Sequence, residues 1–339
     1  MHMADALITP AVGGVMMAAS AGAIGYSVRK VKEELDDKKV PLMGVMGAFV
    51  FAGQMINFTI PATGSSGHIG GGILLAALLG PYAAFLVLSA VILIQALFFA
   101  DGGLLALGCN IFNMGFYACF IAYPMIYRQI IKKSFDPKRI TLGAILAVVA
   151  GLQLGAFSVV LQTWISGVTE LPFASFTALM QPIHLAIGLV EGIATAAVLS
   201  FVYQCNPSLL EGADEADFKK RMERKKLITT LLIIALLIGG ALSLFASASP
   251  DGLEWSMEGV AGTAELEAEG QAYRFAEKIQ GITSFLPDYG FKNGTESDTA
   301  AGTSVSGIVG GGITLGLACL AGYLINRWKK KVKPNQCQS

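Results

Sequence analysis

The sequence predicts an all-α integral membrane protein with about nine transmembrane spans. Hydrophobic residues make up 54% of the 339 residues and charged residues only 14%, whereas roughly a quarter of a soluble domain is charged. Most Lys and Arg residues fall in four short clusters, and long apolar segments lie between the clusters. These clusters are Arg29–Lys39, Arg128–Arg139, Lys219–Lys226 and Arg327–Lys333.

The basic clusters also predict which side of the membrane each loop occupies. Lys and Arg concentrate in cytoplasmic loops, because a cation at the bilayer centre costs about 2.5–3.5 kcal/mol on insertion scales. The first apolar segment, Ile8–Val28, is followed by basic residues and has no Lys or Arg before it. We therefore expect the amino terminus outside the cell and the carboxyl terminus in the cytoplasm. This charge order is atypical of a cleaved signal peptide, although Ala19–Ala23 resembles a cleavage site.

Eight further spans are expected. The first of them is Leu42–Phe58. The polar stretch "TIPATGSSGHIGGG" follows it, and such a stretch is tolerated at membrane depth only inside protein or along a water-filled cavity. Gly80-Pro81 and "ADGG" at 100–103 then favour three crossings, the first of them short, over a single crossing with two re-entrant pieces. The last four spans are Ile140–Trp164, Ile183–Tyr203, Leu227–Ala246 and Val305–Ile325.

Composition divides the chain into two modules. We expect a seven-span domain at residues 1–205, a cytoplasmic basic linker at 206–226, and a two-span module at 227–339. The two-span module carries a polar outer loop at about 247–304, and Ser247–Thr303 has a net charge of −7. An acidic surface of this kind raises the local concentration of cations. The change in composition suggests a fusion of two genes.

Few side chains are candidates for chemistry. The chain has three histidines, and it lacks the GxxxxGK[ST], HExxH and GxSxG motifs, so neither ATP binding nor an enzyme activity is expected. No feature points to nucleic acid as a partner. The five cysteines lie in or beside apolar segments or in the tail, and we expect neither disulfides nor a cysteine metal site.

His2 directly follows the initiator methionine. Removal of Met1 needs a small second residue, so Met1 is expected to remain. The terminal amine, the deprotonated amide nitrogen of His2 and its imidazole Nδ1 can then chelate one metal in a plane and leave one corner open. His68 lies in the outer glycine-rich loop and is the natural fourth ligand. Amide coordination in a planar field favours Ni(II) or Cu(II), while the sequence leaves nickel against cobalt open.

Other polar residues in apolar surroundings are secondary candidates. His184 and Glu191 stand seven residues apart, on one face of a helix. A buried contact that locks helices together and a functional role near the metal are both open for this pair. We place Asp101 and Asn57 in the same group, as residues that support the ligands or take part in conformational change.

Several motifs together resemble one family. "MH", "GQMINFTIPATGSSGHIGGG", "QALFFADGGLLALGCNIFNMG" and "HLAIGLVEG" resemble the CbiM/NikM substrate-capture components of energy-coupling-factor (ECF) nickel and cobalt transporters. "PDGLE" at Pro250–Glu254 is similar to the NikN-type component, fused here to the first module. Ala4 and Ala6 stand where the family typically has Pro and Gly, and Asp5 is kept, so the bend of the terminus is expected to be made differently.

This resemblance implies a multi-pass protein of a prokaryotic plasma membrane that captures Ni(II), with Co(II) as second choice, through Met1, His2 and His68. It also implies separate partners, namely a transmembrane ECF coupling protein and cytoplasmic ABC ATPases. A different class of function stays open at this point: a membrane protein whose acidic loop docks or senses a partner, with the histidines incidental. A residue added before Met1 separates the two, because it abolishes metal capture only under the first.

Overall fold

The computed structural model describes residues 1–34, 39–168, 170–213, 222–292 and 299–332, and they are mostly helical. The first part of the chain forms η1 (Asp5–Leu7), α1 (Pro10–Glu34), α2 (Lys39–Gln54), α3 (Gly72–Leu79), α4 (Pro81–Phe98), α5 (Leu107–Ile111), η2 (Phe112–Tyr127), α6 (Arg128–Ile131), α7 (Pro137–Ser166), α8 (Phe173–Cys205) and η3 (Pro207–Leu209). The second part forms α9 (Arg224–Gly240), η5 (Leu242–Phe245), α10 (Gly252–Ala261), α11 (Gln271–Thr283), η6 (Pro287–Tyr289) and α12 (Thr299–Val332). Strands β1 (Phe58–Thr59) and β2 (Ser66–Gly67) pair antiparallel.

Seven helical segments within the described residues are long and apolar enough to cross a membrane. They are α1, α4, the continuous α5–η2–α6, α7, α8, α9 with η5, and α12. The other two predicted spans are shorter, because α2 has 16 residues and α3 only 8. At 1.5 Å per residue α3 is about 12 Å long, against about 30 Å of hydrocarbon. The membrane class is confirmed, and the count of nine spans stays a prediction.

Helix α3 is short because a polar loop precedes it. Ser65 and Ser66 are fully buried, whereas Pro61 and Ala62 at the tip of the hairpin are exposed, so the part of the loop next to His68 is the part that lies inside the protein. At the other end of α3, Gly80 takes a positive φ of 83°, and Pro81 begins α4 with its ring at the first helical position. The polar loop before α3 and the Gly80-Pro81 break after it therefore limit α3 to 8 residues.

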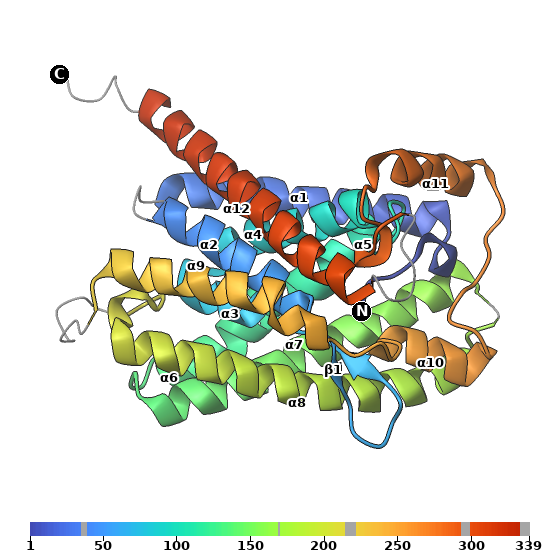
Figure 1. Cartoon of the computed structure of the whole chain (residues 1–339), viewed down its shortest axis with the longest axis horizontal. Helices are drawn as coiled ribbons and strands as arrows, with labels where there is room; N and C mark the ends of the chain where they lie inside the picture. The colour runs from blue at the N-terminus through green and yellow to red at the C-terminus, as the bar shows by residue number, and fades with distance from the viewer. Residues whose placement is uncertain (35–38, 169, 214–221, 293–298, 333–339) are drawn as a thin grey trace.

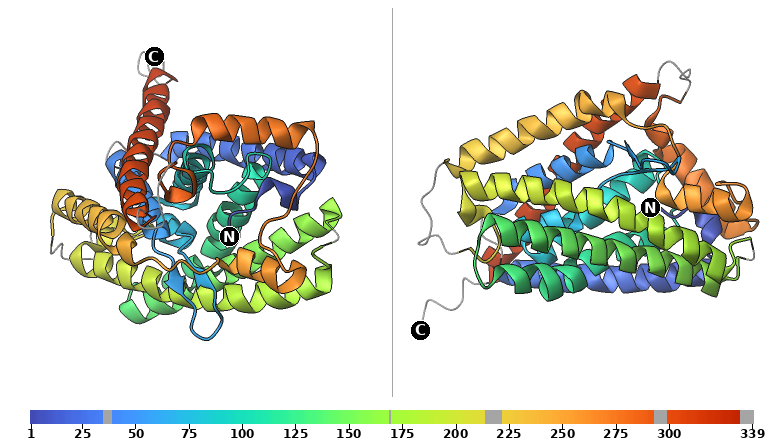
Figure 2. Two further views of the ribbon diagram at one scale, coloured as in Figure 1. Left: turned by 45° about the vertical axis from the view of Figure 1, so that its right-hand side comes forward. Right: turned by 90° about the horizontal axis from the view of Figure 1, so that it is seen from below.

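The two modules pack as one bundle. Helix α7 lies along α8, while α12 and α9 of the second module both pack against α2 of the first. The start of α9 and the carboxyl end of α12 lie at the left of Figure 1 with α6, and we call this the basic end. The N-terminus, α10 and α11 lie toward the right, at what we call the site end, and Figure 2 shows the N-terminus among the helices.

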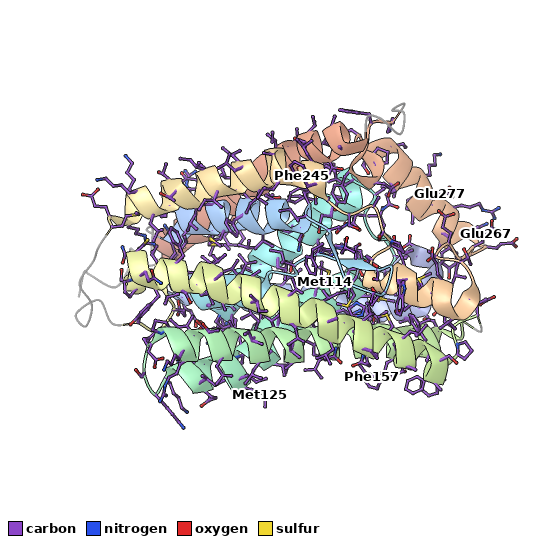
Figure 3. The ribbon with its side chains drawn as sticks, turned by 60° about the horizontal axis from the view of Figure 1, so that its bottom comes forward. Met114, Met125, Phe157, Phe245, Glu267 and Glu277 are labelled. Atoms are coloured by element: carbon purple, nitrogen blue, oxygen red, sulfur yellow. The ribbon has the colours of Figure 1, made fainter. Side chains whose placement is uncertain are left out.

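The flanks of the bundle are apolar. Met125, Phe157 and Phe245 are exposed and lie on the outer surface in Figure 3, whereas Met114 is buried in its interior. Large exposed apolar side chains around the waist of a helical bundle are the surface that lipid covers. Glu267 and Glu277 project at one end, beyond this apolar surface. The distribution fits a multi-pass protein of the plasma membrane.

The contact between α1 and α5 predicts a stability effect. A Cβ at Gly108 would lie 2.3 Å from the backbone nitrogen of Met17, so Gly108→Ala forces the helices apart. Overpacking of this kind costs about 1–3 kcal/mol, and we expect a lower Tm in detergent. Gly14→Ala, in the same helix α1, is the control. A Cβ at Gly14 has nothing within 4 Å, so this variant should keep the wild-type Tm or raise it slightly. An unchanged Tm for Gly108→Ala would contradict the packing.

Candidate metal-capture site

The first residues of the chain enter the bundle instead of fraying. Met3 is fully buried and Met1 is only 6% exposed. The N–H of Met3 donates to Asn110 Oδ1 at 2.7 Å, and the Met3 carbonyl accepts from Asn110 Nδ2 at 3.1 Å. The N–H of Gly103 donates to the same carbonyl at 2.9 Å. The "ADGG" loop and α5 thus hold the terminal arm by its backbone.

Asp5 fixes the bend of the terminal arm, in which Ala4 and Ala6 stand in place of Pro and Gly. Ala4 is extended, with ψ 159°, and a single 3₁₀ turn, η1, follows it. Asp5 Oδ1 accepts the N–H of Ala106 at 2.9 Å, which ties the turn to the loop before α5. The carboxylate is partly buried, and burial raises its pKa against the opposing hydrogen bonds from the loop. The turn therefore depends on the Asp5 carboxylate.

The hairpin β1–β2 places His68 opposite the terminal amine. His68 directly follows β2, and its Nε2 lies 3.3 Å from the Met1 nitrogen. Its Nδ1 lies 3.1 Å from the Ile69 carbonyl, which can only accept, so Nδ1 carries the hydrogen and Nε2 presents a lone pair. Burial, followed by the charges of the amine and His2, lowers the pKa of His68 to about 3. His68 is consequently a neutral imidazole, the form that ligates metals.

His2 stacks on His68 and is held by two acceptors. The two ring centroids are 5.4 Å apart, at an interplanar angle of 16°. His2 Nδ1 lies 3.1 Å from Asp101 Oδ1, and its Nε2 lies 3.2 Å from Gln95 Oε1. Gln95 in turn donates from its amide nitrogen to Gln54 Oε1 at 2.8 Å. For His2 Nδ1 to bind a metal, it must therefore give up its contact with Asp101.

Asp101 is itself fixed by the second module. The hydroxyl of Tyr289, in η6, donates to Asp101 Oδ2. Burial alone would raise the pKa of the Asp101 carboxyl, but His2 and the Tyr289 hydroxyl outweigh burial and lower this pKa to about 2. Asp101 therefore stays ionised beside His2, which orients the imidazole.

Asp251 is the site residue that the sequence did not single out. Its Oδ2 lies 2.5 Å from the Met1 ammonium, and its Oδ1 accepts the N–H groups of Leu253 and Glu254 at 2.7 and 3.0 Å. Glu254 completes a capping box at the start of α10. Burial would raise the pKa of Asp251, but the neighbouring ammonium outweighs it and lowers the pKa. The "PDGLE" stretch is thus a helix cap whose spare carboxylate oxygen binds the terminal amine.

The remaining predicted residues surround this cluster. Glu191 is buried on α8, and its Oε1 accepts the N–H of Gly71 at 2.9 Å, in the loop that carries His68. His184 is buried on the same helix and bonds the Met180 carbonyl through Nδ1 at 2.8 Å. The structure ties Glu191 to the loop, not to His184. The Asn57 carbonyl accepts from the N–H of Ser247 at 2.8 Å, where the second module begins to cover the loop.

A polar vestibule opens beside the cluster. This cavity has a volume of about 460 Å³, and His68 and Asn57 line it together with acidic side chains. The acidic residues are Asp101, Asp251, Glu254 and Asp288. A cavity with these walls concentrates cations beside His68, whose Nε2 lies 3.3 Å from the Met1 nitrogen.

The donor atoms around Met1, His2 and His68 are of an unusual kind for a metal site. Within the described ranges, no three His, Cys, Asp or Glu side chains are grouped to hold a metal, and the described cysteines are free thiols. Cys337 lies outside the described residues. Two imidazoles and the nitrogens of the terminal backbone are instead the donors that meet, and this set suits nickel, copper or cobalt better than magnesium or calcium.

The fold and this site define a multi-pass membrane protein that handles a transition-metal cation. A model of the family "Cobalt uptake substrate-specific transmembrane region" (CbiM) matches residues 2–209, and a PDGLE domain matches 225–327. The chain belongs to the CbiM family. It is a transport component of a metal uptake system, and its relatives are transport proteins rather than enzymes.

Individual relatives cover either the first module or the whole chain. A protein of Archaeoglobus fulgidus assigned as a fused nickel transport protein, NikMN, is 32% identical over 97% of this chain and 99% of its own. A protein of Haloquadratum walsbyi assigned to metal transport is 35% identical over 62% of this chain and 93% of its own. The crystal structure of a truncated transition metal transporter superposes with a TM-score of 0.53 at 32% identity, over 60% of this chain and 99% of the other.

The anchoring of the terminal arm makes a prediction that needs no metal. Because Met1 is buried, a broad-specificity aminopeptidase should trim the wild-type chain slowly. Asp5→Ala removes the acceptor of the Ala106 N–H, a loss of about 1–3 kcal/mol, so trimming should accelerate roughly tenfold. Asp136→Ala, which removes a helix cap at the basic end, should leave trimming unchanged. Equal trimming of Asp5→Ala and wild type would show that the arm is not held this way.

Proposed function

We propose that the chain is the substrate-capture component of an ECF-type transporter and takes up Ni(II), with Co(II) as the alternative. The observation that carries the proposal is the meeting of the Met1 amine with His68 Nε2 at 3.3 Å, beside the ring of His2. The amine, the His2 amide nitrogen, His2 Nδ1 and His68 Nε2 supply four nitrogens to one plane. Planar nitrogen coordination with an amide ligand favours nickel over cobalt. A full-length relative assigned to nickel transport supports the same choice.

Metal binding rearranges the existing contacts at two points. The amine gives up its ion pair with Asp251, and His2 Nδ1 gives up Asp101. Both carboxylates stay close to the bound dication, where their charges are favourable. The ordered loop around His68 needs little change, because Nε2 already presents its lone pair to the amine. Capture is thus an exchange of protons and carboxylates for a metal.

The second module covers the capture site from two sides. On the His68 side, Ser66 donates its N–H to the Pro250 carbonyl at 2.8 Å, and Trp255 Nε1 donates to the Thr63 carbonyl at 2.9 Å. On the Asp101 side, the N–H of Asp288 donates to the Phe99 carbonyl at 2.7 Å. We infer that the second module orders the loop that carries His68 and the loop that carries Asp101. Its acidic outer loop then forms the entrance for the cation.

Energy for uptake comes from other chains in this proposal. The sequence has no phosphate-binding loop of the Walker type, so ATP hydrolysis belongs to cytoplasmic ABC ATPases that act through a transmembrane coupling protein. The proposed orientation places the site end outside the cell and the basic end in the cytoplasm, where these partners dock.

Point changes test the four-nitrogen site. His2→Ala and His68→Ala should each abolish the visible absorption band of planar nickel, because each removes one corner of the plane. A single residue added before Met1 should do the same, since it replaces the amine by an amide. Glu267→Gln, an exposed change in the acidic segment, and an extension at the carboxyl terminus are controls that should keep the band. Stoichiometric nickel binding in either histidine variant would sink the proposal.

Proton release gives an independent prediction. The ammonium and the His2 amide each lose a proton on binding, whereas His68, with its pKa of about 3, has none to lose at neutral pH. Binding should release roughly two or more protons per metal, and affinity should fall about a hundredfold for each pH unit of acidification while two protons are released. Calorimetry in buffers of different ionisation enthalpy measures this number. Affinity independent of pH would mean that neither group ligates.

A further inference from the structure

A second, smaller cavity adjoins the capture site on the side of α8. Its volume is about 40 Å³, room for one metal ion with a water molecule. Met1 and His68 line one part of it, and His184 and Glu191 line another. The cavity therefore continues from the capture residues toward the middle of a membrane-spanning helix.

His184 presents an unused nitrogen at this cavity. The residue is 1% exposed, and its Nδ1 donates to the Met180 carbonyl. Its Nε2 is buried and has no hydrogen-bond partner among the described residues. A protonated imidazole buried without an acceptor is costly, so Nε2 holds a lone pair. Buried polar groups are ordinarily satisfied, and an orphaned one that lines a cavity calls for a ligand.

Gly252 brings the backbone of the second module against the His184 ring. A Cβ on Gly252 would lie 3.4 Å from His184 Nε2. Gly252 follows Asp251, the carboxylate that binds the Met1 amine, and it lines the same cavity as Met1, His68 and His184. Glu191 lies two helical turns further along α8, about 10 Å away along the axis, and lines the same cavity.

We propose that His184 Nε2 is the first ligand of the metal after it leaves the capture site, in the cavity between α8 and the His68 loop. This inference rests on the proposed function. A dication cannot cross an apolar interior without donors along its route, and imidazole and carboxylate are both ligands that nickel and cobalt accept. His184 supplies the nitrogen next to the capture plane, and the Glu191 carboxylate supplies oxygen deeper in the bundle.

Direct binding and transport together test the inner position. The purified full chain with its native terminus is titrated with Ni(II) alone, and uptake of radioactive nickel is measured in cells that carry the complete transport system. His184→Phe keeps the ring volume, and His184→Gln keeps a donor for the Met180 carbonyl. Both variants should retain the planar nickel band, lose a weaker second equivalent of nickel, and take up nickel at least tenfold more slowly. Gln181→Ala, on the same helix outside the cavity lining, should behave as wild type.

Other results overturn the inference. Wild-type uptake in both His184 variants, or a second equivalent that persists in His184→Gln, would show a packing role. Loss of the planar band in His184→Gln would place His184 within the capture site itself. A wild-type chain that shows no planar nickel removes the proposed function, and this inference with it, whatever the His184 variants do.

Discussion

The ion pair between the Met1 amine and Asp251 is the contact on which the arrangement of the candidate site depends. It ties Met1, the first residue of the chain, to Asp251, which caps α10 in the second module. Taking an ammonium out of water is expensive unless a carboxylate and hydrogen bonds accompany it. The capping box supplies those bonds to Asp251, and the pair holds the terminal arm beside His68.

From this contact the roles of the surrounding elements follow. The arm must be bent, which Asp5 and η1 accomplish, and His68 must be fixed, which the buried strand β2 and Glu191 accomplish. The loop that carries His68 directly precedes α3, which has only 8 residues. In the proposed function, the irregular polar segments of the chain thus gather at one place, and regular helices packed against lipid support them.

Sequence patterns predicted much of this arrangement. Long apolar segments between basic clusters predicted the long helices, and the chemistry of a terminal Met-His predicted the meeting of Met1, His2 and His68, which lie together in the structure. Whether they bind metal is still a proposal. Asp251 was missed because it lies about 250 positions away, and the pattern D-x-x-E indicates only a helix cap, not what the spare oxygen touches. The position of Asp101 beside His2 Nδ1 likewise depends on tertiary structure, because the hydroxyl of Tyr289 in the second module holds the Asp101 carboxylate.

X-ray absorption spectroscopy of nickel bound to the full chain with a native amino terminus is the most direct test of the account. If the Met1 amine exchanges Asp251 for the metal, the spectrum should show the pre-edge feature of planar nickel and a first shell of nitrogen donors alone. A six-coordinate nickel with oxygen ligands would mean that the metal binds the carboxylates of the vestibule while the amine keeps its ion pair. That result would contradict the central role given to the amino terminus.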